Sequence, residues 1–402
     1  MTIPRTAIQP PDPAGVLPGP ETARGFFQLA PEIHFLNHGS FGALPRSVQE
    51  AQDHWRARIE AHPIKLLGRE CPDLLKEALG PVADLVGARR DELCFVTNAT
   101  EGINALLRSM EFAPGDELLT TNHVYNAIRQ AMKYRARETG GSYVEVDVPL
   151  PIASEQQILD VIMSAVTDRT RLLIIDHITS PTAIVFPIEQ LVSMARQRGI
   201  RIIIDGAHGP GMVPLELDSL GADAYVANLH KWICAPKGCA FMWVAPEHQG
   251  SVHPATISHY LDDGYFDEFS WQGTRDITAW LSAPAAIEFI SQWGLQDLMD
   301  RNHQMAAWAH QMLCSRWDVK PCSPLDGSLL GSMAMVELPV NLTRRFDSPE
   351  HLMEVLYDRF SIEVPIKDHV FEQWLLRVSC QIYNEPDDYH VLADAITELV
   401  NE

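Results

Sequence analysis

The chain has 402 residues, of which 46% are hydrophobic and 21% are charged, a composition typical of a globular enzyme. Its length exceeds that of one typical core, which predicts a large domain and a smaller one. The formal net charge of −22 argues against nucleic acid or an anionic membrane as a partner.

Seven cysteines are scattered along the chain without a paired spacing. This pattern predicts neither a metal site nor a disulfide framework, and it favours a reducing cytoplasm. No apolar run is long enough to span a membrane, and the first 21 residues lack the apolar core of a signal peptide. Because they are rich in Pro and Gly, we expect residues 1–30 to form a loose N-terminal arm that can pack on a partner subunit.

The first motif along the chain is a Gly-punctuated stretch, HFLNHGSFGALP, over residues 34–45. Asn37 and His38 are unusual residues for a mere linker, and the alternative interpretation is a surface loop. Apolar residues that recur on one face then predict helices over 47–61 and 72–85.

A strand over 93–97 and a helix over 103–110 flank the turn TNATEGIN, which contains Ala99, Thr100 and Gly102. Such a turn sets backbone N–H groups at a helix N-terminus, where free donors and the helix dipole favour an anion. The alternative is that Thr or Asn is only an N-cap at this position.

Three further strands are predicted in the next part of the chain, over 117–121, 142–148 and 171–178. The first leads to NHVYN, in which His123 and Tyr125 are two residues apart and share one face of an extended chain. The third ends in TSPT, where Ser180 offers a hydroxyl group. A Ser before Pro is also a common turn former.

Two apolar strands are predicted in the middle of the chain, over 201–207 and 224–230, and reactive side chains lie at their ends. Asp205 lies in the first strand and His208 directly after it. Asn228 and His230 lie in the second strand and Lys231 directly after it. Adjacent strand ends would place a carboxylate, an imidazole and an amine at one sheet edge. Pyridoxal phosphate needs this set, because a lysine forms the Schiff base and a carboxylate keeps the pyridine nitrogen protonated. Lys237 is the competing lysine, in an expected loop.

A strand over 239–245 brings the number to about seven, with helices between many of them, which predicts a mainly parallel, doubly wound α/β sheet that gathers its ligand at the strand ends. Helices and strands follow over 281–292, 295–316, 332–338, 349–359 and 374–379. We therefore expect an arm (1–30), a large domain (31–285) and a small α+β domain with a linker helix (286–402).

Arg377 lies inside the last apolar strand. Burying an arginine there costs free energy unless the side chain meets an anion, and the planar guanidinium suits a carboxylate. A structural ion pair is the alternative.

These motifs in combination resemble class V aminotransferase-type pyridoxal phosphate enzymes of fold type I. FLNHGSFGALP, DHITSPTA and DGAHGPG resemble the isopenicillin N epimerase-like group most, and the resemblance spans about residues 35–383. It implies a large domain with a mainly parallel seven-stranded sheet, a small C-terminal α+β domain, and a homodimer with shared active sites.

The resemblance also implies a role for each candidate residue. Lys231 would carry the cofactor, Asp205 would bind its ring nitrogen, and His123, or alternatively Tyr125, would stack on its ring. Thr100, Asn228 and His230 would hold the phosphate, together with Thr274 from the neighbouring subunit, and Ala99 would also belong to the cofactor site. Ser180 and His208 would bond the ring oxygen, with Asp205 as the alternative partner of His208. Asn37, His38 and Arg377 would hold the substrate.

The implied reaction takes place at the α-carbon of an amino acid, through an external aldimine and a quinonoid, with the freed Lys231 amine as general base. Epimerisation is favoured; the alternatives are a C–S lyase of the cysteine desulfhydrase or sulfoxide lyase type, an aminotransferase, and, from another class, a non-catalytic regulator that binds the cofactor. Cysteine desulfurases of this class carry a nucleophilic Cys shortly before the strand that holds the Arg. Residues 323–379 contain no Cys, which argues against persulfide formation.

Overall fold

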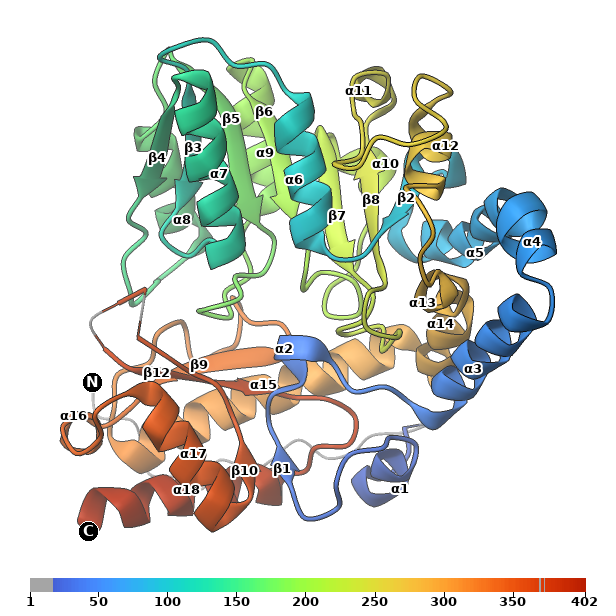
Figure 1. Ribbon diagram of the computed structural model, residues 1–402. Helices are drawn as coiled ribbons and strands as arrows, with labels where there is room; N and C mark the ends of the chain where they lie inside the picture. Colours follow the sequence, from blue (N-terminus) through green and yellow to red (C-terminus); the bar gives the residue numbers. More distant parts are fainter. Residues whose placement is uncertain (1–16, 369, 372) are drawn as a thin grey trace.

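A seven-stranded sheet organises most of the chain (Figure 1), whose computed structural model describes residues 17–368, 370, 371 and 373–402. The strand order is β2-β8-β7-β6-β5-β3-β4. Only β8 runs antiparallel to its neighbours; the other pairs are parallel. The strands are β2 (Leu93–Val96), β3 (Glu117–Thr121), β4 (Ser142–Val146), β5 (Thr170–Asp176), β6 (Arg201–Asp205), β7 (Ala224–Asn228) and β8 (Ala240–Val244). The predicted mainly parallel sheet is confirmed.

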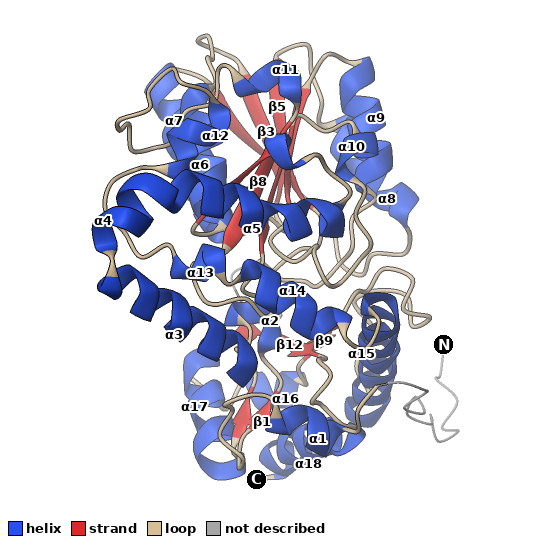
Figure 2. Cartoon of the chain, turned by 90° about the vertical axis from the view of Figure 1, so that its right-hand side faces the viewer, coloured by secondary structure: helices blue, strands red, loops and turns tan. Residues whose placement is uncertain are grey.

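Helices cover both faces of this sheet (Figure 2). One face packs against α6 (Ala99–Ser109), α7 (Asn126–Thr139) and α12 (Tyr265–Ser270). The other packs against α5 (Cys71–Val86), α8 (Glu155–Ser164) and α9 (Ile188–Gln197). The strands are apolar runs rather than alternating ones because both of their faces are buried: Ile202 and Ile204 enter one core and Ile203 the other.

A smaller three-stranded sheet lies below the first in Figure 1, at the carboxyl ends of its parallel strands. It has the order β11 (Ile366–Lys367), β12 (Leu375–Ser379), β9 (Met333–Glu337) and is antiparallel. It has its own core, to which α15 (Leu295–Trp317), α16 (Val340–Thr343), α17 (Pro349–Phe360) and α18 (Pro386–Asn401) contribute. The chain therefore has the small C-terminal sheet domain that the sequence predicts.

The N-terminal part of the described chain joins the two regions. β1 (His34–Phe35) pairs in parallel with β10 (Ile362–Glu363) of the C-terminal region. The next helices are α2 (His38–Phe41), α3 (Arg46–Ala61), α4 (Pro63–Lys65), the π-helix η1 (Leu66–Glu70) and, before β2, the 3-10 helix η2 (Arg90–Glu92). The remaining short ones are α10 (Leu217–Leu220), α11 (Pro246–Gln249), α13 (Thr278–Leu281) and α14 (Ala283–Ser291). None of the described helices is both long and apolar enough to cross a membrane.

Two local predictions need correction. The expected loose arm is packed where it is described: α1 (Pro20–Gly25) forms, and Phe27 is 2% exposed; residues 1–16 lie outside the described residues. The helix predicted from residue 103 begins at Ala99, because the Asn98 side chain accepts a hydrogen bond from the backbone N–H of Glu101 at 2.9 Å and caps it. The helix predicted over 281–292 corresponds to α14.

The domain boundary that the sequence predicts at residue 285 lies inside α14. Phe289 and Ile290 of this helix belong to the core of the large sheet, whereas Met305 and later residues of α15 belong to the core of the small one. We propose to keep the two domains and to place the boundary between α14 and α15.

Candidate active site

Lys231 lies in the loop after β7 and is buried. Its Nζ atom is 3.0 Å from Nε2 of His208, and the indole N–H of Trp232 donates to Nδ1 of the same imidazole at 3.2 Å. Because Nδ1 accepts that hydrogen bond, a neutral His208 carries its proton on Nε2 and donates it to the amine. This network requires Lys231 to be an uncharged amine.

The electrostatic surroundings of Lys231 agree with that requirement. Burial and then the Arg377 cation lower the pKa of Lys231 to about 7, against the opposing pull of Asp205 and Asp176. Burial also holds the pKa of His208 well below its ordinary value. A buried, uncharged lysine is the nucleophile that imine formation with an aldehyde needs. Lys237, the competing lysine, donates to the carbonyl of Gly42 at 3.0 Å instead.

Asp205 ends β6 and is 2% exposed. Burial raises its pKa to about 6, while the backbone N–H of Ala207, which donates to Oδ1 at 3.0 Å, and the nearby Lys231 amine favour its charged form. The turn that follows requires glycine, because a Cβ atom on Gly206 would lie 2.0 Å from a ring carbon of Tyr225. A cationic ring nitrogen is a partner that would satisfy this buried carboxylate.

The N-terminus of α6 is tied to the end of β7. The side-chain oxygen of Asn228 accepts a hydrogen bond from the backbone N–H of Ala99 at 2.9 Å, so the amide of Ala99 already has a partner. Asn228 therefore orients the helix end. The imidazole of His230 bonds the carbonyl of Cys239 through Nδ1 at 3.1 Å, which leaves Nε2 for another partner. Direct phosphate contacts of Thr100 and His230 remain predictions.

His123 and Tyr125, the alternatives for ring stacking, differ in their surroundings. His123 is fully buried, with Nδ1 2.6 Å from the hydroxyl of Thr182 and Nε2 2.8 Å from the carbonyl of Val148. These two bonds fix the plane of its ring. Tyr125 is 48% exposed. The fixed ring of His123 favours it as the stacking platform, which stays a prediction.

Arg377 is 2% exposed, and no ion pair involves it among the described residues. Its Nη1 donates to the backbone carbonyl and the hydroxyl of Ser180, and its Nη2 donates to the hydroxyl of Ser40 at 3.1 Å. Its Nε has no partner among the described atoms. Burial lowers its pKa to about 10. A buried guanidinium with only neutral partners is an anion-binding group, so the alternative of a structural ion pair does not hold.

Three further candidate residues have hydrogen-bond partners within the protein. His38 is fully buried, with Nε2 3.0 Å from the Lys231 carbonyl and Nδ1 2.7 Å from the hydroxyl of Tyr383. Asn37 donates to Glu363 at 3.0 Å and accepts from the hydroxyl of Ser40. Ser180 accepts hydrogen bonds from Arg377. Direct contacts of these three residues with substrate or cofactor stay predictions.

Thr274 is exposed on this chain, in the segment after α12. The neighbouring Arg275 approaches Glu101, near the start of α6, with 3.9 Å between the closest charged atoms. An exposed position is compatible with a contact across a subunit interface, which remains a prediction.

Sequence reasoning missed Asp176 and Ser40. Asp176 ends β5 directly beside Asp205, in strand register. Its signal was present, since the endings Ile-Ile-Asp of β5 and β6 are the same. Ser40, a direct partner of Arg377, follows the recognised Asn37-His38-Gly39 and has no distinguishing signal of its own.

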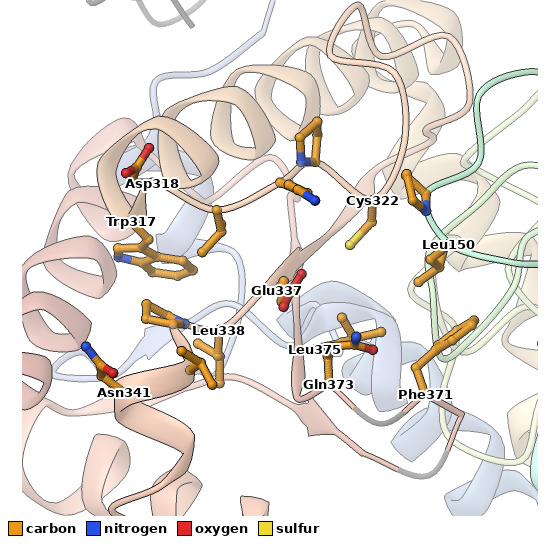
Figure 3. A pocket seen from close by; sticks show the side chains of 16 residues that line it. Leu150, Trp317, Asp318, Cys322, Glu337, Leu338, Asn341, Phe371, Gln373 and Leu375 are labelled. Atoms are coloured by element: carbon orange, nitrogen blue, oxygen red, sulfur yellow. The ribbon is translucent and has the colours of Figure 1, made fainter. Parts of the chain in front are cut away.

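A cavity of about 590 Å³ lies beside the site, between the β4–α8 connection and the small sheet (Figure 3). Cys322, Leu150 and Phe371 line one end, and Trp317 and Asn341 the other. Phe371 also packs edge-on against His123, with 5.3 Å between ring centroids.

Cys322 lies one residue before the cysteine-free stretch, so it is the cysteine to consider as a persulfide-accepting nucleophile. Burial raises its pKa to about 12, which disfavours the thiolate that a persulfide-accepting nucleophile needs.

Comparison with known proteins identifies the family. The Aminotransferase class-V model matches residues 41–336, and the chain belongs to this family. It is 33% identical to isopenicillin N epimerase from Amycolatopsis lactamdurans over 395 residues, covering 94% of this chain and 98% of that protein. It is 32% identical to a probable chloroplastic L-cysteine desulfhydrase from Arabidopsis thaliana over 400 residues, covering 92% and 84%.

The fold has a solved counterpart as well. The structure of a cysteine desulfurase from Thermococcus onnurineus superposes with a TM-score of 0.80 at 20% identity, covering 96% of this chain and 99% of that one. The protein is thus a class V enzyme that depends on pyridoxal phosphate. The residues present fit this cofactor: the amine of Lys231, the buried carboxylate of Asp205 and the N-terminus of α6 would supply the three contacts that it needs.

Proposed function

We propose that the protein is an epimerase or racemase of the isopenicillin N epimerase-like group, which inverts the α-carbon of an amino acid or of the amino-acid side chain of a small peptide. The observation that carries amino-acid chemistry is Arg377, a buried cation without an anionic partner among the described residues. A substrate α-carboxylate would complete its hydrogen bonds. The charge of Arg377 also lowers the pKa of Lys231. A substrate carboxylate bound to Arg377 would therefore be held close to the Lys231 amine.

The side chains of the site then have distinct tasks. Pyridoxal phosphate, when bound, withdraws electrons from the α-carbon. Arg377 binds and orients the carboxylate, and the uncharged Lys231 amine takes the α-proton as general base. Inversion is complete when a solvent-derived proton is added to the opposite face of the α-carbon. His208 holds that amine in place through Nε2. Asp205 supplies the negative charge opposite the ring nitrogen.

The choice of epimerisation is supported by an epimerase relative that matches along 98% of its own length. A C–S lyase is the second candidate, because the desulfhydrase relative is equally similar and β-elimination of sulfide needs no cysteine nucleophile. Transamination and a non-catalytic regulator are the remaining alternatives, and the uncharged Lys231 amine argues against the regulator.

One experiment separates these functions. The holoenzyme is incubated with single amino acids in D2O, and deuterium uptake at the α-carbon, chirality and keto-acid release are followed together. An epimerase incorporates deuterium with inversion and releases no keto acid. Sulfide, pyruvate and ammonia from cysteine would establish the lyase instead, keto acid without sulfide would establish transamination, and bound cofactor without exchange on any amino acid would indicate a regulator.

We also propose a homodimer with shared active sites in a reducing cytoplasm. Large apolar side chains are exposed near the site and the Thr274 segment, with exposed fractions of 71% for Phe41, 52% for Ile257 and 47% for Leu261. A second copy that covers them would bring its Thr274 to this chain. Light scattering tests the dimer, and restoration of activity on mixing Lys231→Ala with Thr274→Ala subunits tests the shared site.

A further inference from the structure

Two carboxyl groups lie side by side at the edge of the large sheet, where the cofactor site is. Asp176 ends β5 and Asp205 ends β6, and the two Cα atoms are register partners. Ile174 and Ile203, two residues earlier on the two strands, pack in the same core under α6 and α7. Because side chains alternate along a strand, both carboxyl groups emerge on that face. Asp176 is 3% exposed and Asp205 is 2% exposed.

The partners of the two carboxyl groups are unequal. Asp205 receives the N–H of Ala207 and is close to the Lys231 amine. The Oδ2 atom of Asp176 is buried with no partner among the described atoms. The backbone N–H groups of Tyr125 and of Asp176 itself, and the cation of Arg129 in α7, favour the charged form of the Asp176 carboxyl group. Arg129 already pairs with Glu145 at 2.7 Å.

Two adjacent buried carboxylates repel each other, so one of them keeps its proton. A charged oxygen without a hydrogen-bond donor is far more costly in a protein interior than a neutral one. The unpartnered oxygen belongs to Asp176, whereas the Lys231 side chain favours the charged form of Asp205. The pKa of Asp176 is accordingly raised well above its ordinary value by burial and then by the charge of Asp205.

We propose that Asp176 is a positioning residue of the cofactor site: a neutral carboxylic acid that accepts the Tyr125 backbone N–H and leaves Asp205 as the single negative charge of the pair. With one charge, the pair matches one cationic ring nitrogen. Through Tyr125, the same carboxyl group also holds the loop that carries His123. The proposal rests on the cofactor site and not on the choice between epimerase and lyase.

The protonation state is tested first on the apoprotein, by infrared spectroscopy. At neutral pH the wild type is expected to show the C=O band of a buried carboxylic acid, which Asp176→Asn removes and Asp168→Asn, at an exposed position, retains. In Asp205→Asn the neighbouring charge is gone, so the band disappears at a lower pH than in the wild type. A band that Asp205→Asn removes and Asp176→Asn keeps would place the proton on the other residue and overturn the proposal.

Stability of the apoprotein gives a second readout. An acid with a raised pKa in the folded state releases its proton on unfolding, so it loses stability as the pH rises above the ordinary pKa of about 3.9. From there to neutral pH, the unfolding equilibrium constant of the wild type relative to Asp176→Asn is expected to increase by up to about tenfold per pH unit. Equal pH slopes for the two proteins would contradict a neutral Asp176. If Asp176→Asn does not fold, Asp176→Ser takes its place in both measurements.

The positioning role is tested by cofactor affinity. Asp176→Leu has a similar size but no acceptor, and it is expected to weaken pyridoxal phosphate binding by about tenfold or more, because the Tyr125 N–H stays unpaired. Asp176→Asn keeps a neutral acceptor and is expected to recover most of that loss. If the Asn variant is as weak as the Leu variant, the site needs a charge at this position, and the proposal fails.

Discussion

The Nζ atom of Lys231 lies 3.0 Å from the Nε2 atom of His208, and the proton between them belongs to the imidazole, because Trp232 occupies the other ring nitrogen. This hydrogen bond needs the uncharged form of the lysine, and a pKa of about 7 makes that form available at neutral pH before any cofactor arrives. Its reactivity in the apoprotein should show this directly.

We expect the labelling rate of Lys231 by an amine-reactive reagent to rise with pH and level off just above neutrality, since its pKa is about 7. Peptide mapping by mass spectrometry measures the rate at this residue. A lysine in a short unstructured peptide is the reference, and it should gain reactivity until about pH 10. A labelling rate at Lys231 that rises with pH in the same way as the reference peptide would contradict the hydrogen bonding of Lys231 to His208.

Two substitutions should move this titration in opposite directions. Arg377→Gln removes a cation that lowers the pKa of Lys231, so the midpoint should rise, whereas Asp205→Asn removes an anion that raises it, so the midpoint should fall. The same labelling experiment measures both. An unchanged midpoint in both variants would show that burial alone sets the pKa of Lys231 and would contradict the two charge effects.

Lys231 rather than Lys237 should carry the cofactor. Borohydride reduction of the reconstituted enzyme followed by peptide mapping is expected to find the label on Lys231. Lys231→Ala should lose the cofactor absorbance and turn over about 10²–10⁴-fold more slowly, the usual contribution of a general base. Lys237→Ala, which loses the bond to Gly42, should keep the label; trapping at Lys237 would refute the assignment.

Arg377→Lys keeps the charge but loses the planar fork. A lost charge-assisted hydrogen bond costs about 1.5–3 kcal/mol, so kcat/KM for the preferred amino acid should fall about 10–100-fold, mainly through KM. The cofactor absorbance should remain. Arg359→Lys, on an exposed helix far along the chain, is the matched control and should have no effect.

His38→Phe leaves the buried carbonyl of Lys231 and the hydroxyl of Tyr383 without their partner. Each such group costs about 1–3 kcal/mol, so thermal or denaturant unfolding should show a loss of that size, with slower cofactor loading. His62→Phe, at an exposed helix end, serves as the control. Normal stability but weaker substrate binding in His38→Phe would restore the substrate contact that the sequence suggested.

Gly42 is where the N-terminal segment meets the lysine loop. Its φ is +71°, and a Cβ atom would lie 2.1 Å from the carbonyl oxygen of His230. Gly42→Ala should therefore displace the Lys231 loop and lower cofactor affinity along with stability. Gly250→Ala, where a Cβ meets nothing within 4 Å, should be tolerated, and equal behaviour of the two variants would argue against this close contact.

The sequence predicted the sheet, Asp205 and Lys231 because strand ends follow from local pattern, and the carboxyl ends of parallel strands meet at one edge. It could have predicted Asp176 by the same rule. It could not predict that His38 supports the backbone of Lys231 or that Ser40 binds Arg377. His38 bonds a residue 345 positions away and Ser40 one 337 positions away, so these contacts exist only once the small domain has packed against the large one.

His38 bonds both the Lys231 carbonyl and the Tyr383 hydroxyl, and this pair of contacts has a consequence for biosynthesis. The strands of the large sheet and the helices that cover them, up to α14, are all translated before Tyr383, with Asp205 and Lys231 at the edge of that sheet. The lysine loop, however, lacks its support until Tyr383 and the β12 strand with Arg377 are also translated. A nascent chain halted between these points would be a folded sheet without an assembled catalytic amine, so vitamin uptake becomes one of the last steps in making this protein.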